Sequence, residues 1–178
     1  MKNIIIGIII GFLLAFGGYK ALSWLEQQNQ LDVSTLPSYS VNFNKEANAT
    51  ANLAEAITKA TKEQKNILLI AGGDWCKWCG TMSNFLEEHP KLQKEFYTQF
   101  EVIRVYYGKG INPSAKALIL KYGKAKGTPH FYVLNSHGEL LHSFVTKALE
   151  RGYGYNRVKF LRFIEKYSKI KTITKDKK

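Results

Sequence analysis

The only two cysteines of the chain, Cys76 and Cys79, stand three positions apart in the run GDWCKWCG at residues 73–80. A Cys-x-x-Cys pair supports two kinds of chemistry, because it can cycle between a dithiol and a disulfide or supply two ligands to a metal ion. The residues on either side of the pair indicate which of these chemistries applies.

The pair is predicted to lie where a buried strand gives way to a helix. Residues 66–71 are a short apolar run typical of a buried strand, and residues 77–88 carry a helical apolar stripe. Free N–H groups and the helix dipole at a helix N-terminus favour an anion, so they would stabilise a thiolate at Cys76. This placement indicates thiol–disulfide exchange.

Zinc binding is the alternative from another class of function, because two cysteines and two histidines can hold the metal. Of the four histidines, only His137 and His142 have a spacing that zinc sites use, and that pair spans a predicted turn into a strand. Gly80 follows Cys79, which excludes the haem-attachment motif Cys-x-x-Cys-His. We therefore expect no metal and no cofactor beyond a redox-active Cys76–Cys79 disulfide.

The bulk composition predicts one ordinary domain with a real core, since 45% of the 178 residues are apolar. The net charge is +12, and residues 169–178 form a basic tail. No nucleic-acid-binding motif or aromatic-interleaved basic patch accompanies this charge, so we expect a solvated surface and no nucleic acid partner. Because both cysteines lie in one motif, cysteine usage does not reveal the redox compartment.

The N-terminus indicates the compartment instead. Residues 4–19 are almost wholly apolar and follow Lys2, as in an export signal. Residues 1–23 are therefore predicted to be a signal peptide or a membrane anchor. Ala15 and Ala21 would suit cleavage, whereas Trp24 would suit an interfacial anchor, the interpretation that we favour slightly. In either case the remainder of the chain is expected to lie outside the cytoplasm.

The predicted elements form an α/β pattern. A polar linker or irregular lead-in at residues 24–49 precedes a domain at 50–168. Strands separated by helices favour parallel pairing, and a short turn at 135–138 makes the last two strands antiparallel. We expect a mixed sheet of about four strands flanked by helices. The elements are helices at 51–64 (capped by Thr50), 77–88, 90–96 and 113–122, strands at 66–71, 100–107, 130–134 and 139–144, and a last helix capped by Asn156, with Val158, Phe160, Leu161 and Ile164 turned inward.

Over residues 50–168 this pattern resembles the thioredoxin superfamily. The resemblance rests on WCKWC at 75–79 after the first strand, and on KYG at 121–123 followed by GTP at 127–129. The residue sequence around the first motif, GDWCKWC at 73–79, and the export signal look most like those of the membrane-anchored or periplasmic thioredoxin-like proteins of bacteria. The resemblance implies a thioredoxin fold and a thiol–disulfide oxidoreductase on the periplasmic side of the cell envelope. It also implies protein thiols and disulfides as substrates and a membrane redox partner.

The resemblance also implies roles for individual residues. Cys76 would be the nucleophilic, partly exposed thiol and Cys79 the buried resolving thiol. Pro129 would be a cis-proline facing the dithiol, the backbone of Thr128 would pair with substrate peptide, and Trp75 would offer a surface for substrate.

Three further residues are expected to tune the pair. Lys77 would stabilise the Cys76 thiolate and make the pair more oxidising, and Trp78 would cover Cys79. Thioredoxins usually carry a buried carboxylate six residues before the first cysteine, where this chain has Ile70. Asp74 is a weak substitute for that acid.

The direction of electron flow stays open between reductase and isomerase. Thr128 before the proline favours an isomerase-like protein, but weakly. His130, directly after the proline, is either an ordinary strand residue or a group that influences the titration of the thiols. A second alternative is a thioredoxin-like module that serves a single partner in cytochrome or metal-centre maturation.

Overall fold

The structure is a computed structural model that describes residues 30–168. The predicted signal peptide or anchor at residues 1–23 and the basic tail at 169–178 lie outside the described residues. Within residues 30–168, no helix is long and apolar enough to cross a membrane.

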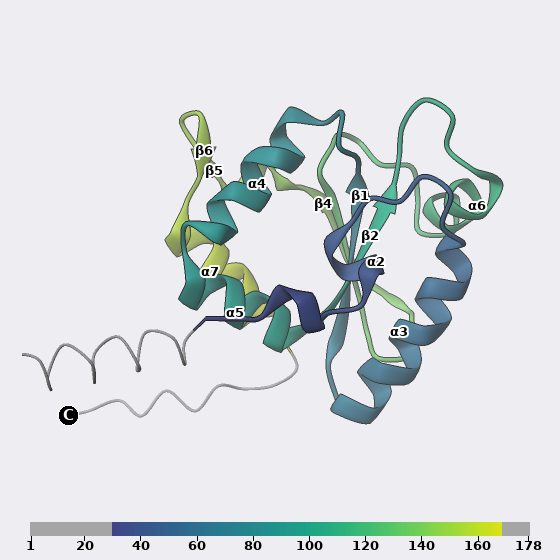
Figure 1. Ribbon diagram of the computed structural model, residues 1–178, viewed down its shortest axis with the longest axis horizontal. Helices are drawn as coiled ribbons and strands as arrows, with labels where there is room; N and C mark the ends of the chain where they lie inside the picture. The colour runs from purple at the N-terminus through teal and green to yellow at the C-terminus, as the bar shows by residue number, and fades with distance from the viewer. Residues whose placement is uncertain (1–29, 169–178) are drawn as a thin grey trace, which may run out of the picture. The chain divides into compact units, whose positions relative to one another are not determined.

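A four-stranded mixed sheet forms the centre of the domain (Figure 1). Its strands are β1 (Asn66–Gly72), β2 (Phe100–Tyr106), β3 (His130–Leu134) and β4 (Leu140–Val145), in the order β2-β1-β3-β4. β1 pairs parallel with β2, whereas β3 is antiparallel to both β1 and β4. The predicted α/β fold with a mixed sheet is confirmed. Parallel pairing holds only for β1 and β2, because the chain reverses over α6 (Pro113–Lys121) and the loop at 122–129 before it enters β3.

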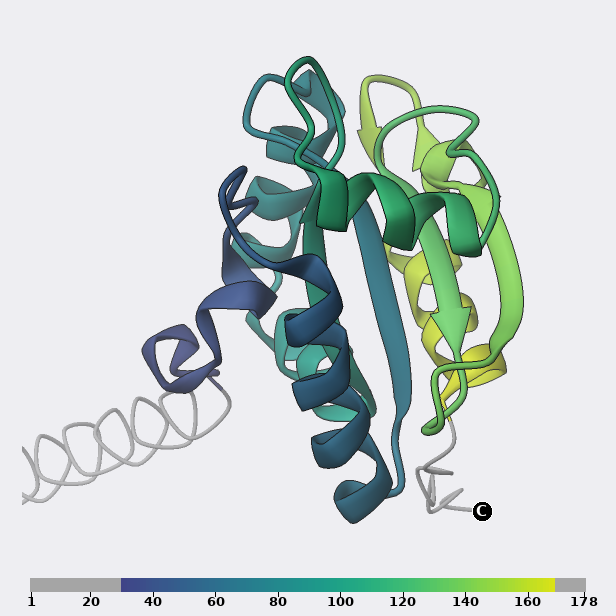
Figure 2. The same cartoon turned by 90° about the vertical axis from the view of Figure 1, so that its right-hand side faces the viewer.

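Helices cover both faces of the sheet, so that β1 is buried along its whole length (Figures 1 and 2). On one face, α3 (Ala49–Glu63) runs along the strands and α6 lies across them. Their apolar side chains form a core with the sheet residues Leu69, Ile103 and Tyr132. The other face is covered by α4 (Lys77–Glu87), α5 (Pro90–Gln99) and α7 (Arg157–Tyr167). Phe96 of α5 and Phe163 of α7 pack against Phe131 of β3.

Side-chain caps set the start of several helices. Asn48, Asn112 and Asn156 each accept a hydrogen bond from a backbone N–H in the first turn, of α3, α6 and α7 respectively. The predicted cap at Asn156 is therefore correct. The predicted cap at Thr50 is wrong, because Asn48 occupies the cap position and α3 begins at Ala49.

The inward face of α7 differs from the expected one. Phe160 and Ile164 are buried as expected, but Val158 and Leu161 are exposed, and Phe163 is buried instead. Phe160, Phe163 and Ile164 follow the three- and four-residue spacing that keeps side chains on one face of a helix. Val158 and Leu161 fall outside that stripe.

The described part of the predicted lead-in is not an irregular linker. It contains a 3-10 helix, η1 (Val33–Thr35), and a short helix, α2 (Ser38–Val41), which packs against β2. Tyr39 and Phe43 are buried, and the Tyr39 hydroxyl donates to Glu101 of β2 at 2.7 Å. Residues 32–168 belong to one compact unit. Four-residue helices carry too little periodicity to be found in a sequence.

A second, two-stranded sheet lies between β4 and α7 and was not expected from the sequence. It consists of β5 (Glu150–Arg151) and β6 (Gly154–Tyr155), which follow a 3-10 helix, η2 (Thr146–Leu149). Strands of two residues leave no alternation of apolar and polar side chains to detect. This hairpin brings Tyr155 next to α4.

Candidate active site

Cys76 lies where it was predicted, between β1 and α4, as the N-cap residue of α4. Its Sγ accepts a hydrogen bond from the backbone N–H of Cys79 at 3.2 Å, so the sulfur serves as the cap of its own helix. Both cysteines are free thiols. The expectation that Cys76 is partly exposed is wrong, because its side chain turns back onto the first turn of α4 and is only 5% exposed.

Cys79 is buried, as expected, and is 2% exposed. Burial raises the pKa of the Cys79 thiol, and its hydrogen bond with Cys76 raises that pKa further. Cys79 is therefore a thiol, not a thiolate, at neutral pH. Gly72 at the end of β1 lies directly against it, since a Cβ at Gly72 would stand 2.5 Å from the Cys79 Sγ. Only glycine leaves the sulfur room at this position.

Trp75 forms an open aromatic surface immediately before the dithiol and is 57% exposed. Its indole lies on two glycines, because a Cβ at either Gly73 or Gly108 would stand 2.5 Å from the Trp75 Nε1. The ring is thus held against backbone while one side faces solvent. Such a surface is suited to contact with a substrate chain.

Asp74 and Lys77 flank the pair and are both exposed. Exposed charges act weakly through water, so Asp74 is a poor replacement for a buried acid and Lys77 a mild influence on Cys76. Ile70 is fully buried, and none of the side chains at residues 67–71 of β1 is ionisable.

The Thr128–Pro129 peptide bond is cis, as expected from the resemblance. Pro129 is buried and Thr128 half-buried. The Pro129 carbonyl accepts hydrogen bonds from the backbone N–H and the hydroxyl of Thr146, both at 3.3 Å. The loop is therefore fixed by η2, which follows β4.

Tyr155 connects the two loops of the site and was missed in the sequence, where no motif marks it. Its hydroxyl donates to the Trp78 carbonyl at 3.4 Å and lies 3.1 Å from the Thr146 hydroxyl, which in turn reaches Pro129. The half-buried Trp78 packs edge-on against the Tyr155 ring, with centroids 5.7 Å apart. Trp78, one of the two residues between the cysteines, is thus linked through β6 to the cis-proline loop.

His130 is an ordinary strand residue with both ring nitrogens satisfied. Nδ1 accepts from the Lys126 N–H at 3.4 Å, so Nε2 carries the proton and donates to the Ser143 hydroxyl at 2.8 Å. Its ring packs on Tyr132, which belongs to the core beneath α3 and α6, on the face opposite α4. Burial lowers the pKa of His130, and Lys126 lowers it further.

Arg104 of β2 is the second residue that the sequence did not single out. It pairs in register with Ile70, the position where the carboxylate was missing, and it is only 7% exposed. The charged residues of β2, Glu101 and Arg104, stand three positions apart, so they fall on opposite faces of the strand, and the sequence gives no sign that both are buried.

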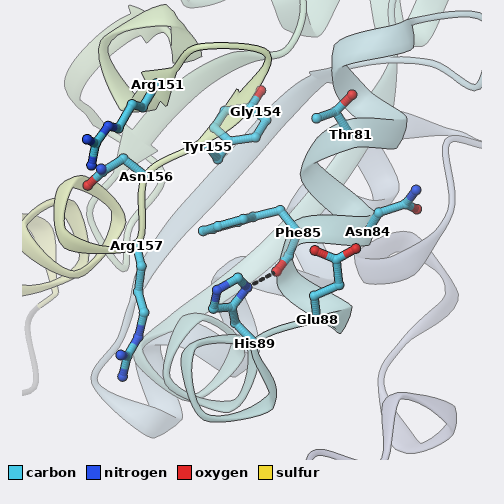
Figure 3. A pocket seen from close by; sticks show the side chains of 10 residues that line it. All are labelled: Thr81, Asn84, Phe85, Glu88, His89, Arg151, Gly154, Tyr155, Asn156 and Arg157. Carbon is cyan, nitrogen blue, oxygen red and sulfur yellow. Dashed lines mark hydrogen bonds between the residues drawn. The ribbon is translucent and has the colours of Figure 1, made fainter.

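A hollow of about 540 Å³ opens between α4 and the residues of β5, β6 and the start of α7 (Figure 3). Thr81 and Asn84 of α4 and its C-cap residue Glu88 lie on one side of it, and Arg151 and Arg157 lie on the other. Of the residues that line the hollow, Tyr155 also contacts Trp78 of the Cys-x-x-Cys motif, and neither cysteine lines the hollow. Among residues 30–168, no three His, Cys, Asp or Glu side chains come together as a metal ion would require.

The model of a family described as Thioredoxin-like matches residues 48–136, from the cap of α3 through the first and second motifs to the end of β3. The chain belongs to the thioredoxin-like family. A disulphide isomerase from Xylella fastidiosa Temecula1 superimposes on this thioredoxin-like chain with a TM-score of 0.59 at 22% identity, covering 71% of this chain and 97% of that one.

A second structural relative is the C-terminal domain of DsbD from Neisseria meningitidis in its oxidised form. Its TM-score is 0.54 at 21% identity, and the match covers 71% of this chain and 99% of that domain. At these identities the likeness establishes the thioredoxin-like fold. No curated protein matches the chain.

Proposed function

We propose that this thioredoxin-like protein is a thiol–disulfide oxidoreductase that exchanges disulfides with protein substrates through Cys76 and Cys79. The observation that carries the proposal is Cys76 at the N-cap of α4, with its sulfur accepting a helix N–H. A buried resolving thiol one turn later and a cis-proline loop tied to the same motif by Tyr155 complete the arrangement.

In the reductive direction the Cys76 thiolate attacks a substrate disulfide, and one substrate sulfur leaves as a thiolate. The resulting mixed disulfide joins Cys76 to the other substrate sulfur. Cys79 then loses its proton and attacks the Cys76 Sγ, which releases the second substrate thiol and leaves a Cys76–Cys79 disulfide. Two electrons pass from the dithiol to the substrate. Trp75 and the Thr128 backbone hold the substrate chain beside the reacting sulfurs.

The finer assignment is a reductase or isomerase outside the cytoplasm. The apolar segment at residues 4–19 supports export to, or anchoring in, the bacterial inner membrane, with the domain on the periplasmic side. A membrane redox partner would then reset the dithiol. The Xylella relative is a disulphide isomerase, which agrees with this range of activities.

The decisive test replaces each cysteine by serine in the full-length protein. Cys76→Ser should abolish reduction of insulin and isomerisation of scrambled ribonuclease, because no nucleophile remains. Cys79→Ser should form mixed disulfides with substrate that persist on a non-reducing gel, because nothing resolves them. Full activity in the Cys76→Ser variant would refute the proposed function.

The reduction potential of the pair tests the direction of electron flow. Equilibration of the full-length protein with glutathione can be followed by the fluorescence of Trp75 and Trp78. A value near about −270 mV would place the protein with thioredoxin-like reductants, whereas a value of about −180 mV would place it with isomerases. A value near about −120 mV, typical of strong oxidants, would contradict the assignment to reductase or isomerase.

A further inference from the structure

Arg104 is buried beneath the active site and held by neutral oxygens on three elements. Its Nε donates to the Ser40 carbonyl of α2 at 3.1 Å, and its two terminal nitrogens donate to the Ser83 hydroxyl of α4 at 3.0 Å and the Tyr97 hydroxyl of α5 at 3.2 Å. These contacts fix the guanidinium in position.

Its positive charge has no anionic partner among residues 30–168, since no carboxylate there forms a hydrogen bond or an ion pair with Arg104. Arginine stays protonated in proteins, and a buried charge without a counter-ion is costly. Glu101, three residues earlier on β2, is engaged elsewhere by Tyr39 and Lys59. While both cysteines are thiols, Arg104 is therefore a buried cation without a counter-ion among the described residues.

The guanidinium lies close to the resolving cysteine. Its carbon stands 5.3 Å from the centre of the Phe43 ring. That ring and the Cys79 Sγ both press on Gly72, where a Cβ would stand 3.1 Å from the ring and 2.5 Å from the sulfur. Ser83, which accepts from Arg104, follows Cys79 by one turn of α4. Arg104, Phe43 and Cys79 thus occupy one buried neighbourhood.

We propose that Arg104 supplies the counter-charge for the Cys79 thiolate that forms when the mixed disulfide is resolved. The inference rests on the proposed function, because only exchange chemistry requires Cys79 to become an anion. In that step Cys79 releases its proton to solvent, its thiolate attacks the Cys76 Sγ, and the substrate sulfur leaves as a thiolate. Arg104 neither gives nor takes a proton and lowers the free energy of the anion by its charge alone.

The ionisable groups that surround Cys79 in residues 30–168 are few. Cys76 caps the same helix, Tyr155 approaches from β6, and Arg104 approaches from β2, while the Tyr97 hydroxyl of α5 accepts from the guanidinium. Burial and Cys76 raise the pKa of Cys79, whereas the Gly73 backbone hydrogen bond and, to a smaller degree, the Arg104 charge lower it. Arg104 thus offsets part of the rise in the Cys79 pKa that burial causes.

The test measures the pH dependence of Cys79 alkylation in the full-length Cys76→Ser protein. Arg104→Met keeps the length of the side chain but removes the charge, and it should raise the midpoint by about one pH unit, as loss of a nearby opposite charge does. Arg104→Lys, which keeps the charge, should restore most of the shift. Ser83→Ala is the matched control, since it removes one hydrogen bond but no charge, and it should leave the midpoint in place. An unchanged midpoint in a folded Arg104→Met variant would overturn the proposal.

A second measurement needs no change at Arg104 and so survives a folding defect in that variant. In the Cys76→Ser protein, the Arg104 Nε–H nuclear magnetic resonance signal should shift with the same midpoint as Cys79 alkylation. A signal that stays constant while Cys79 titrates would also overturn the proposal.

The kinetic consequence separates this inference from the proposed function. With Ellman's reagent, release of the second coloured thiolate from the protein reports the attack by Cys79. Arg104→Met should slow that release about threefold at neutral pH, because a tenfold loss of thiolate is partly offset by the greater nucleophilicity of a more basic thiol. Slow release with intact first-step kinetics supports the role of Arg104. Absence of exchange in the unmodified protein would refute the proposed function, while the Cys79 titration could still be measured.

Discussion

Two glycines on either side of the dithiol should respond in opposite ways to the same added methyl group. Gly72 ends β1 beneath Cys79, and Gly80 follows Cys79 in the first turn of α4. A Cβ at Gly72 would stand 2.5 Å from the Cys79 Sγ and 3.1 Å from the Phe43 ring, whereas a Cβ at Gly80 would meet nothing within 4 Å. The pair therefore compares one chemical change in a filled and an open environment.

The expected magnitudes follow from these distances. Heavy atoms in contact prefer a separation of roughly 3.5–4.0 Å, so Gly72→Ala must displace the Cys79 sulfur or the Phe43 ring by about 1 Å. Overpacking of this kind costs about 1–3 kcal/mol. Gly80→Ala instead gains about 0.4–1 kcal/mol, because alanine reduces the freedom of the unfolded chain and favours the helix.

Urea unfolding of the reduced, full-length proteins measures both effects. The midpoint should fall for Gly72→Ala and rise for Gly80→Ala, with the slope unchanged in each case. Gly72→Ala should also delay the resolving step, since it moves the attacking sulfur. A midpoint for Gly72→Ala equal to that of the parent protein, or shifts of the same sign in both variants, would refute the packing described for Cys79.

Two further outcomes follow from the site. Tyr155→Phe keeps the ring but removes the hydroxyl that contacts Trp78 and Thr146, and it should lower the free energy of unfolding by about 1–2 kcal/mol in urea titrations. Tyr153→Phe, at a fully exposed position two residues earlier, should change nothing, and equal losses in the two variants would contradict the bridging role. Burial lowers the pKa of His130 below its usual 6.5, so the unfolded chain binds more protons at acidic pH. Its contribution to stability should be complete above about pH 6.5 and decline as the pH falls through the folded-state pKa, and His130→Gln should flatten that part of a plot of urea midpoint against pH.

The sequence predicted those parts of the site that depend on local chemistry. Cys76 and Cys79 follow an apolar run and open a helix, and this order alone places a thiol at a helix N-terminus. The cis bond before Pro129 was predicted from the family motif, and the structure contains it. The sheet and most of its helices followed from periodicity, which is strongest in long elements.

The features that the sequence did not predict depend on contacts between distant segments. A charged residue in a strand would ordinarily face water, but Arg104 is buried in part by α2, which accepts a hydrogen bond from it. A helix of four residues leaves no detectable pattern in the sequence. Tyr155 reaches the dithiol through a hairpin of two-residue strands. Cys76 is more enclosed than expected because its sulfur caps α4. Each of these is a tertiary effect that no local pattern records.

The position of α2 over β2 also determines where a working fragment of the protein must begin. β2 is an outer strand of the sheet, and an uncovered outer strand offers its backbone to other chains as a template for pairing. α2 packs on this strand, and the Ser40 hydroxyl donates a hydrogen bond to the Val102 carbonyl. A fragment that begins at residue 48, where the family match begins, would keep both cysteines. It would, however, expose β2 to pairing with other copies and remove the acceptor of the Arg104 Nε–H. The segment that contains α2, which the sequence suggests is a linker, thus covers the outer strand β2 of the sheet.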